Sequence, residues 1–555
     1  MAILGPGRWR VLLPGRKPKG ICMKSRKITG WTYASAALAG AMLAGTAASA
    51  KTLVYCSEGS PENFTPAINT TGTSFDAARP VYNRLVEFKR GTVETAPGLA
   101  ESWEVTVGGK TITFKLRKGV KFHSVKDFTP TRDFNADDVL WSFNRMWKAD
   151  HPYAKISGGK YDYFADMDMP ALLDTLTKTD DYTVVMKLKS PNVAILANLA
   201  MDFAAIGSAE YAGALLKKGT PEQFDQVPVG TGPFSFVTYQ KDAVIRYKAN
   251  PAYFGEKALV DDLVFAITKD ATARYSKLKA NECQINSYPA PADLAEMKKD
   301  PTLKVISASG LNIAFWAFNV TKPPLDRKEV RQALSMAVDR DAIIRDVFLG
   351  NGEKAKTLIP RTMWSYNDAI VDYPYDPAKA KAMLTAAGVT SLDMDLWYQP
   401  VQRPYNPNGK RIGEMMQADL AKVGVNAKLV TYEWGEYRKR AQGGEHMTAQ
   451  LGWTGDNGDP DNFFFLDSCV DGKPISNNIP KWCNAEFNDL LAKARLVPDQ
   501  AARAKMYSRM QEIEHDEAPE LLVAHSIVSE AMRANVEGYK QSPLGTHAFE
   551  GVDVK

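Results

Sequence analysis

Alternation of hydrophobic and polar positions predicts strands in the first half of the chain. In TITFKLRKGVKFH (111–123), apolar residues alternate with polar ones on both sides of Lys118-Gly119, which predicts a β-hairpin. The segment NADDVLWSFNRMW (135–147) has helical spacing instead, with Asn135 as the N-cap and two aspartates in the first turn. Further strands are predicted at KTLVYC (51–56), at YTVVMKLKSP (182–191), within VGTGPFSFVTYQ (229–240) and at the start of LVDDLVFAITKD (259–270), before a helix from Asp270.

The second half of the chain alternates strands with amphipathic helices. The predicted strands are 311–320, 392–398, 425–434 and 446–455, and the predicted helices are 325–348, 376–388, 408–424 and 436–444. This alternation favours a largely parallel sheet with crossover helices. Ligands of such sheets bind beyond the carboxyl ends of strands. Two loops, YQPVQRPYNPN (398–408) and GWTGDNGDPDNFF (452–464), lie at such ends, and we expect them to face one site.

The first fifty residues have the composition of a targeting segment. They hold eight Lys or Arg and no acidic residue, with small and apolar residues from Tyr33 to Ala48. Ala48-Ser49-Ala50 matches the A-x-A pattern that precedes a signal-peptidase cut. Residues 1–50 are therefore predicted to be a signal peptide with an upstream extension, removed before Lys51. The run is too rich in Ala and Gly to favour the alternative of a membrane anchor, and Met23 is an alternative start.

Removal of this segment changes the charge of the chain. The 555 residues are 45% hydrophobic and 24% charged, which is globular composition with length for two or more cores. The net charge of +5 becomes about −3 without the first fifty residues, so nucleic acid is not an expected partner. No later stretch is apolar enough to cross a bilayer, and we expect a soluble protein outside the cytoplasm, in the periplasm.

Four of the five cysteines remain after the predicted cleavage. An even number in an oxidising compartment indicates disulfides. Three pairings are possible. The short Gly-, Pro-, Asn- and Ser-rich loop between Cys469 and Cys483 favours a local bridge, which leaves Cys56 with Cys283.

Motifs of common enzymes and metal sites are missing from the sequence. It has no H-E-x-x-H, no G-x-S-x-G and no G-x-x-x-x-G-K-[ST], and the acids around His515 in EIEHDEAP (512–519) lack ligand spacing and read as a solvated helix end. Neither Asp456 nor Asp459 starts an EF-hand pattern. We therefore expect no catalytic residue, no metal and no cofactor.

The two loops carry opposite charges beside aromatic residues. Asp456 follows an apolar strand and Trp453, which suggests a buried carboxylate whose cationic partner is a ligand. A surface turn is the alternative, and it explains Asp459-Pro460-Asp461 well. Arg403 stands between Gln402 and Pro404, where its guanidinium either holds a carboxylate with two hydrogen bonds or stacks on Tyr405 at the surface.

At these loops the chain resembles the dipeptide-binding proteins of bacterial dipeptide ABC importers, within the solute-binding protein family 5 (the peptide- and nickel-binding group). The resemblance covers 51–555. VQRPYNPN (401–408) and GWTGDNGDPDNFF (452–464) are specific to the dipeptide branch, whereas PGLAESWEV (97–105) and GTGPF (230–234) mark only the wider family. Other segments that carry the resemblance are KTLVYCSEGSPENFTP (51–66), VYNRLVEFKRGT (81–92), LRKGVKFH (116–123) and VTYEWGEY (430–437).

The resemblance implies an α/β fold with two lobes, the type II (cluster C) periplasmic binding protein, in which helices flank mixed sheets and the ligand cleft lies between the lobes. Lobe I is implied at 51–309 and 526–555, with an extra subdomain around 80–230, and lobe II at 310–525. The same two disulfides, Cys56–Cys283 and Cys469–Cys483, are implied.

The resemblance also implies a ligand site. Asp456 takes the ammonium group of a peptide, Arg403 takes its carboxylate, and the backbone of Thr70, Thr71 and Gly72 lines the opposite lobe. The implied contacts are completed by Pro404, Tyr405, Trp453, Thr454 and Gly455.

The implied function is dipeptide capture by lobe closure and delivery to an inner-membrane ABC permease, without catalysis and as a monomer. The alternatives are a related cargo (a longer peptide, haem or 5-aminolevulinate) and, in another class, a secreted peptidase.

Overall fold

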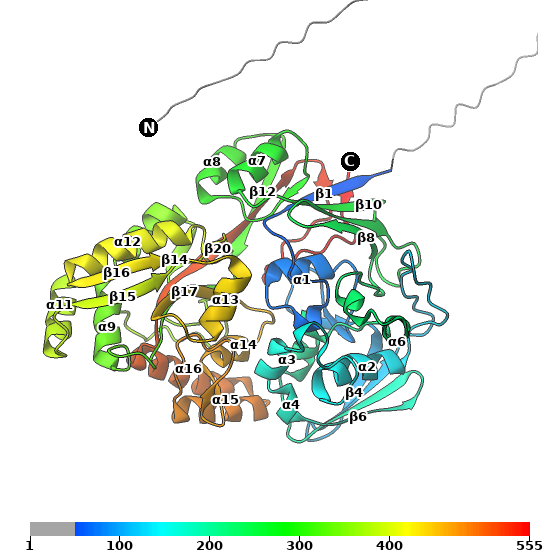
Figure 1. Ribbon diagram of the computed structural model, residues 1–555, viewed down its shortest axis with the longest axis horizontal. Helices are drawn as coiled ribbons and strands as arrows, with labels where there is room; N and C mark the ends of the chain where they lie inside the picture. The colour runs from blue at the N-terminus through cyan, green and yellow to red at the C-terminus, as the bar shows by residue number, and fades with distance from the viewer. Residues whose placement is uncertain (1–49) are drawn as a thin grey trace, which may run out of the picture. The chain divides into compact units, whose positions relative to one another are not determined.

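A computed structural model of the chain describes residues 50–555 (Figure 1). The predicted signal peptide lies outside the described residues except for Ala50. Within residues 50–555, none of the helices has the length and apolar character needed to cross a membrane.

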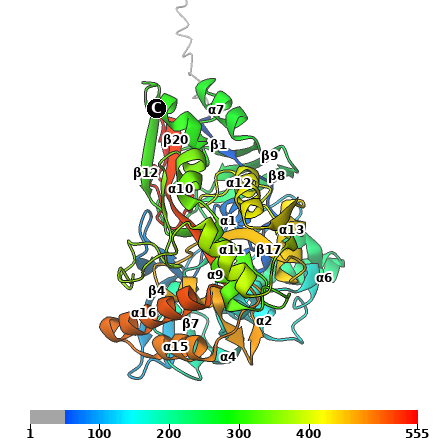
Figure 2. The ribbon, with the colours of Figure 1, turned by 90° about the vertical axis from the view of Figure 1, so that its left-hand side faces the viewer.

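One large sheet forms the framework of the fold. Its strands in spatial order are β16 (Val425–Val430), β15 (Leu392–Trp397), β17 (Thr448–Thr454), β13 (Asn312–Phe318), β20 (Glu520–Arg533), β11 (Ile285–Asn286), β1 (Thr52–Ser57), β10 (Asp262–Ile267), β9 (Val244–Ala249) and β8 (Phe234–Gln240), and β20 also pairs with β12 (Leu303–Ser309) and β14 (Gly352–Lys354). The long strand β20 joins the two halves of this sheet, because its first residues pair with β13 and its last with β11 and β12 (Figures 1 and 2).

The sheet is mixed, as the family resemblance implies. Parallel pairs occur between β15 and both β16 and β17, and between β1 and both β10 and β11. The pairs that β13 and β20 make are antiparallel. The expectation of a largely parallel sheet is therefore wrong. The prediction failed because β17, β13 and β20 are neighbours in space although long stretches of chain separate them. No local pattern in the sequence indicates whether such strands pair in parallel or antiparallel.

Helices surround the large sheet and the smaller sheet described below. They are α1 (Gly72–Ala78), α2 (Ala136–Trp147), α3 (Asp162–Asp166), α4 (Met169–Leu172), α5 (Ile195–Leu199), α6 (Ala209–Lys218), α7 (Ala271–Lys279), α8 (Leu294–Met297), α9 (Lys328–Ala337), α10 (Arg340–Ile343), α11 (Pro377–Ala386), α12 (Gly409–Lys422), α13 (Trp434–Gln442), α14 (Asp461–Phe464), α15 (Ala485–Leu496) and α16 (Gln500–Glu517). The N-cap predicted at Asn135 is confirmed, with a complete capping box to Asp138.

A smaller antiparallel sheet lies between β1 and β8 in the sequence. Its order is β4 (Ala100–Val105), β5 (Thr111–Leu116), β7 (Thr183–Leu188) and β6 (Leu173–Asp180), and α2 packs on it (Figure 1). Its core continues into that of the second half of the chain, since Phe114 and Phe463 belong to one buried cluster. The lobe boundaries implied by the resemblance stay a prediction.

Three local expectations are wrong. Residues 120–122 form no strand, because β5 is already paired on both sides by β4 and β7; Val120 and Phe122 are buried without a ladder. The helix expected over 325–348 breaks after α9 at Val338, and Asp339 caps a new helix, α10. The end of α16 is not solvated throughout: Glu512 and Asp516 are exposed, but Glu514 is 1% exposed and the ring of His515 stacks on that of Tyr373, with 4.5 Å between centroids.

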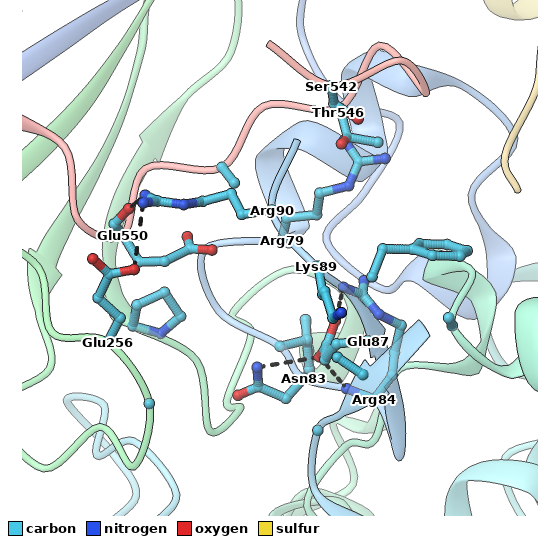
Figure 3. Close-up of a pocket in the computed structure, with 18 of the residues that line it drawn as sticks. Arg79, Asn83, Arg84, Glu87, Lys89, Arg90, Glu256, Ser542, Thr546 and Glu550 are labelled. Carbon is cyan, nitrogen blue, oxygen red and sulfur yellow. Dashed lines mark hydrogen bonds and ion pairs between the residues drawn. The ribbon is translucent and has the colours of Figure 1, made fainter. Parts of the chain in front are cut away.

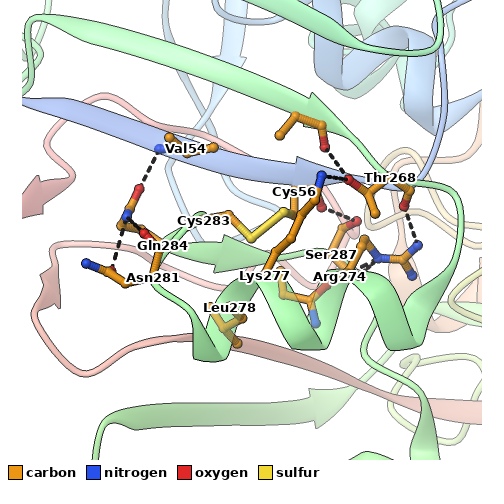
Figure 4. The surroundings of a disulfide bond; sticks show 12 residues. Val54, Cys56, Thr268, Arg274, Lys277, Leu278, Asn281, Cys283, Gln284 and Ser287 are labelled. Carbon is orange, nitrogen blue, oxygen red and sulfur yellow. Dashed lines mark hydrogen bonds between the residues drawn. A yellow bond between two sulfur atoms is a disulfide. The ribbon is translucent and has the colours of Figure 1, made fainter.

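Both disulfides favoured by the sequence are confirmed. Cys56 is bonded to Cys283 and Cys469 to Cys483, with Cα atoms 5.9 and 5.8 Å apart. The first bridge closes a loop of 227 residues and fixes β1 beside the segment that follows α7 (Figure 4).

Candidate functional site

A cavity collects nine of the ten predicted ligand-binding residues from distant parts of the chain. It has about 620 Å³ of empty space, which includes open solvent. Its lining contains Thr70, Thr71, Gly72, Arg403, Pro404, Tyr405, Trp453, Thr454 and Asp456. Gly455 does not line it: its N–H donates to the carbonyl of Leu311 at 2.7 Å, and a Cβ there would meet the Phe463 ring at 2.8 Å.

Asp456 lies two residues beyond the end of β17, and one of its carboxyl oxygens has no hydrogen-bond partner among residues 50–555. Its backbone N–H is held by the Asn462 side chain at 2.7 Å. Within residues 50–555, its buried Oδ2 atom makes no hydrogen bond. Burial, and then the negative charge of Asp202, raise the pKa of Asp456 to about 8, while Arg79 opposes the rise. A buried carboxyl group of this kind is stabilised as an anion only when a cation reaches it.

The two other aspartates of that loop have partners within the protein. Asp459 accepts from Arg503 at 2.6 Å, and Asp461 accepts from Arg495 at 2.7 Å. The Asp459 carboxylate also accepts from the backbone N–H of Asp461 at 3.0 Å, which is the turn-shaping role expected of it. Asp456 is thereby distinguished from its neighbours as the carboxylate that faces the cavity.

Arg403 is a buried residue at 8% exposure, which rejects the alternative of a surface arginine. Its guanidinium lies over the ring of Trp434, with 4.9 Å between Cζ and the ring centroid. Its Nη1 donates to Glu58 at 3.0 Å and to Thr73 Oγ1 at 2.9 Å. A tight turn, closed by two backbone hydrogen bonds of 3.0 Å between Arg403 and Asn406, holds its backbone.

The segment before α1 forms the opposite wall. The N–H and the hydroxyl of Thr70 both donate to Glu62 at 3.0 Å, and Thr71 is the N-cap of α1. A Cβ placed on Gly72 would meet no atom within 4 Å, so the backbone is exposed to the cavity there.

Aromatic side chains close the remaining sides. Trp453 is stacked on Tyr163 with 5.8 Å between ring centroids, and its Nε1 donates to Asn462 at 3.1 Å. Tyr405 packs against Gly452, where a Cβ would lie 2.4 Å from its ring. Glycine at position 452 is thus required for Tyr405 to reach the site.

Several residues of the candidate site were not predicted from the sequence. Among them are Glu58, which bonds Arg403, and lining residues Phe75, Arg79, Tyr163, Tyr288, Trp434 and Arg438. Glu58 directly follows the carboxyl end of β1, which is the position where ligand-site residues of α/β sheets are sought. Trp434 lies in VTYEWGEY, a segment that the resemblance singled out without assigning it a role.

A second cavity shares Asp456 and Arg79 with the first. Figure 3 shows part of its lining. Its charged lining is mostly paired within the protein. Arg79 and Arg84 both bond Asp202, at 2.6 and 2.9 Å, and Arg90 bonds Glu256 at 3.3 Å. Asp456 and Arg79 line both cavities, but Arg403 lines the first and not the second. Across residues 50–555, no group of three or more His, Cys, Asp or Glu side chains has an arrangement that could hold a metal ion.

Comparisons with known proteins agree with this architecture. The family model described as bacterial extracellular solute-binding proteins, family 5 Middle, matches residues 94–472. The chain is 55% identical to the dipeptide-binding protein of Escherichia coli (strain K12), over 93% of this chain and 97% of that protein. It is 49% identical to heme-binding protein A of Haemophilus influenzae, over 91% and 92% of the two chains. The crystal structure of the dipeptide-binding protein of Pseudoalteromonas sp. SM9913 in complex with Met-Leu superposes with a TM-score of 0.87 at 37% identity, over 91% of this chain and 100% of that one.

Proposed function

We propose that this chain, which belongs to the bacterial extracellular solute-binding proteins of family 5, captures dipeptides in the periplasm and passes them to an inner-membrane ABC permease. The names of its relatives support this cargo, since they include dipeptide-binding proteins, one of them with Met-Leu bound. The protein itself performs no chemistry on the peptide, and residues 1–50 are removed on export.

One observation carries the proposal. A single cavity is lined by Asp456, whose buried Oδ2 accepts no hydrogen bond within residues 50–555, and by the buried guanidinium of Arg403. A dipeptide is a zwitterion whose charged ends match these two groups. The ammonium of the peptide binds Asp456 and its carboxylate binds Arg403, as charge-assisted hydrogen bonds that gain strength once the cleft excludes water.

Two fixed opposite charges also select the length of the ligand. One extended residue spans roughly 3.3–3.6 Å, so an added residue moves one end of the peptide away from its partner. The side chains of the peptide are not fixed by charged partners and are accommodated by water or by unfilled volume in the cavity.

Replacement of either charged residue tests the site. We expect Asp456→Ala and Arg403→Ala each to weaken binding of Ala-Phe by about 2–5 kcal/mol, at least about thirtyfold in Kd, measured by calorimetry. The control is Asp489→Asn, which removes an exposed ion pair with Lys493 on α15 and leaves Kd unchanged. Unchanged affinity in both site variants refutes the proposal.

Cargo of another kind is the second candidate, because a relative that is 49% identical is named a heme-binding protein. Titration with di-, tri- and tetrapeptides, haem and 5-aminolevulinate separates these ligands. Only dipeptide binding should depend on both charged residues. Incubation with Ala-Phe should release no free amino acids, which distinguishes a binding protein from a peptidase.

A further inference from the structure

The guanidinium of Arg403 is fixed by hydrogen bonds at Nη1 and by an aromatic ring on one of its faces. Glu58 Oε1 and Thr73 Oγ1 both accept from Nη1, and the hydroxyl of Thr73 donates in turn to Glu58 Oε1, which closes a triangle of hydrogen bonds. Trp434 covers a face of the planar group. Within residues 50–555, Nε and Nη2 of Arg403 donate no hydrogen bond.

Nε and Nη2 form the edge of the guanidinium that arginine uses for side-on pairing with a carboxylate. Arg79 shows this geometry in the same molecule, since its Nε donates to Asp202 Oδ1 at 3.0 Å and its Nη2 to Oδ2 at 2.6 Å. Two parallel bonds of this type fix both the distance and the plane of a carboxylate. The contacts at Nη1 thus determine where the available edge of Arg403 points.

Glu58 lies in a rigid part of the fold, which keeps it in place beside Arg403. It stands one residue beyond β1, whose Cys56 is bonded to Cys283 (Figure 4). The hydroxyl of Ser287 lies 2.9 Å from the Cys56 carbonyl and 3.3 Å from Glu58 Oε2, so these two acceptors share its single proton. Arg274, completely buried nearby, donates to Gln402 at 3.0 Å and so fixes the residue before Arg403.

Glu58 remains an anion in these surroundings. Burial acts to raise its pKa, but the positive charge of Arg403 and the hydrogen bond from Thr73 outweigh burial and hold the pKa below its usual value. A negative charge therefore stays 3.0 Å from the guanidinium that is to receive a second carboxylate.

We infer that Glu58 is a positioning and specificity-determining residue of the carboxylate subsite: it orients the Nε–Nη2 edge of Arg403 and offsets part of its charge. The inference rests on the proposed function. Because the carboxylate of Glu58 and that of the ligand share one guanidinium, they repel each other, and Glu58 limits how strongly a free carboxylate is preferred over a neutral group.

The decisive measurement is the preference for the free acid, the ratio of Kd for Ala-Phe amide to Kd for Ala-Phe. In Glu58→Gln the amide oxygen still accepts from Arg403, so the guanidinium stays in place while the opposing charge is lost. We expect the ratio to rise at least about tenfold over wild type. A change in fold or packing alone would alter both Kd values together and leave the ratio unchanged.

Asp225→Asn is the matched control. Asp225 also pairs with a buried arginine, Arg145 at 2.9 Å, but lies outside the site, so its loss should lower stability and leave the ratio as in wild type. A wild-type ratio near one would overturn the proposed carboxylate contact itself. A large wild-type ratio that Glu58→Gln leaves unchanged or lowers would overturn the inference about Glu58 alone.

Glu58→Asp covers the case in which the glutamine variant does not fold. It keeps the buried charge but withdraws it from Arg403 by one methylene group. We expect its ratio to exceed that of wild type about threefold. A ratio equal to that of wild type in a folded aspartate variant contradicts the inference.

Discussion

At the scale of single residues, the carboxyl group of Asp456 is poised to change its protonation state when a cation arrives. Its pKa of about 8 means that most molecules of the empty protein carry a proton there at pH 7. An ammonium group within hydrogen-bond distance favours the anion and lowers this pKa. Under the proposed function, ligand capture and proton release are therefore linked.

We predict that binding of Ala-Phe at pH 7 releases close to one proton. Because Asp456 must ionise, affinity should rise with pH up to about 8; above that the peptide amine, whose pKa is about 7.7–8.0, loses its own proton. Calorimetry in buffers of different ionisation enthalpy measures the number of protons. In Asp456→Asn the release should vanish, and a wild-type enthalpy independent of the buffer would contradict the linkage.

A second group of buried carboxyls affects stability rather than binding. Burial, and then the charge of Asp467, raise the pKa of Glu514 well above its usual value, and burial raises that of Asp467 to about 7. A carboxyl whose pKa is raised on folding stabilises the protein fully below its unfolded pKa of about 4 and loses that contribution as the pH rises toward its folded pKa.

Glu514→Gln is therefore expected to raise the melting temperature at pH 8 relative to wild type, by more than it does at pH 5. Thermal unfolding at both pH values measures the difference. Glu512→Gln, a neighbouring change on the exposed side of α16, should have the same small effect at both. A Glu514→Gln effect that does not vary with pH would show that these carboxyls do not titrate as a buried group.

At the scale of elements, the loop after β17 depends on two helices that follow it in the sequence. Arg495 of α15 holds Asp461, and Arg503 of α16 holds Asp459. These contacts, together with the hydrogen bonds of Asn462 to Trp453 and Asp456, set the conformation from which Asp456 reaches the cavity.

We expect Asp461→Asn to cost about 3 kcal/mol of stability, because it leaves Arg495 partly buried without its counter-ion. Its effect on Ala-Phe affinity should be smaller than that of Asp456→Ala, since Asp461 does not line the cavity. Urea unfolding and calorimetry on the same preparation measure the two effects. An affinity loss equal to that of Asp456→Ala would mean that Asp461 itself contacts the ligand.

At the scale of the whole molecule, the two disulfides constrain very different lengths of chain. Cys56–Cys283 joins residues 227 apart, whereas Cys469–Cys483 joins residues 14 apart. In the chain-entropy description, cross-linking stabilises by restricting the unfolded chain, by roughly 5 kcal/mol for the long loop and roughly 3 kcal/mol for the short one.

Replacement of both cysteines of a pair by serine tests this difference. The variant without Cys56–Cys283 should unfold at a lower urea concentration than the variant without Cys469–Cys483. It should also bind Ala-Phe more weakly, because the bridge supports the strand end that carries Glu58. Equal losses in the two double variants would contradict both expectations.

The sequence by itself determined most elements and pointed to the two charged residues of the proposed site. Asn135 caps α2 and Gly388 follows α11 with a positive φ, because capping and left-handed turns depend on residues next to one another. Asp456 and Arg403 were predicted because each is a charged residue next to aromatic residues or prolines, within a segment that resembles a known family.

Only the tertiary structure decided which distant residues meet. The mixed direction of the sheet, the pairing of Arg403 with Glu58 across 345 positions and the stacking of Arg403 on Trp434 rather than Tyr405 depend on how far-separated segments pack. The same holds for α16, where burial of Glu514 reverses the reading of a charged helix end as solvated. Periodicity and capping involve residues a few positions apart, so the sequence predicts helices, strands and their ends. Burial and ion pairing depend on how distant segments of the chain pack together, which the sequence alone does not indicate.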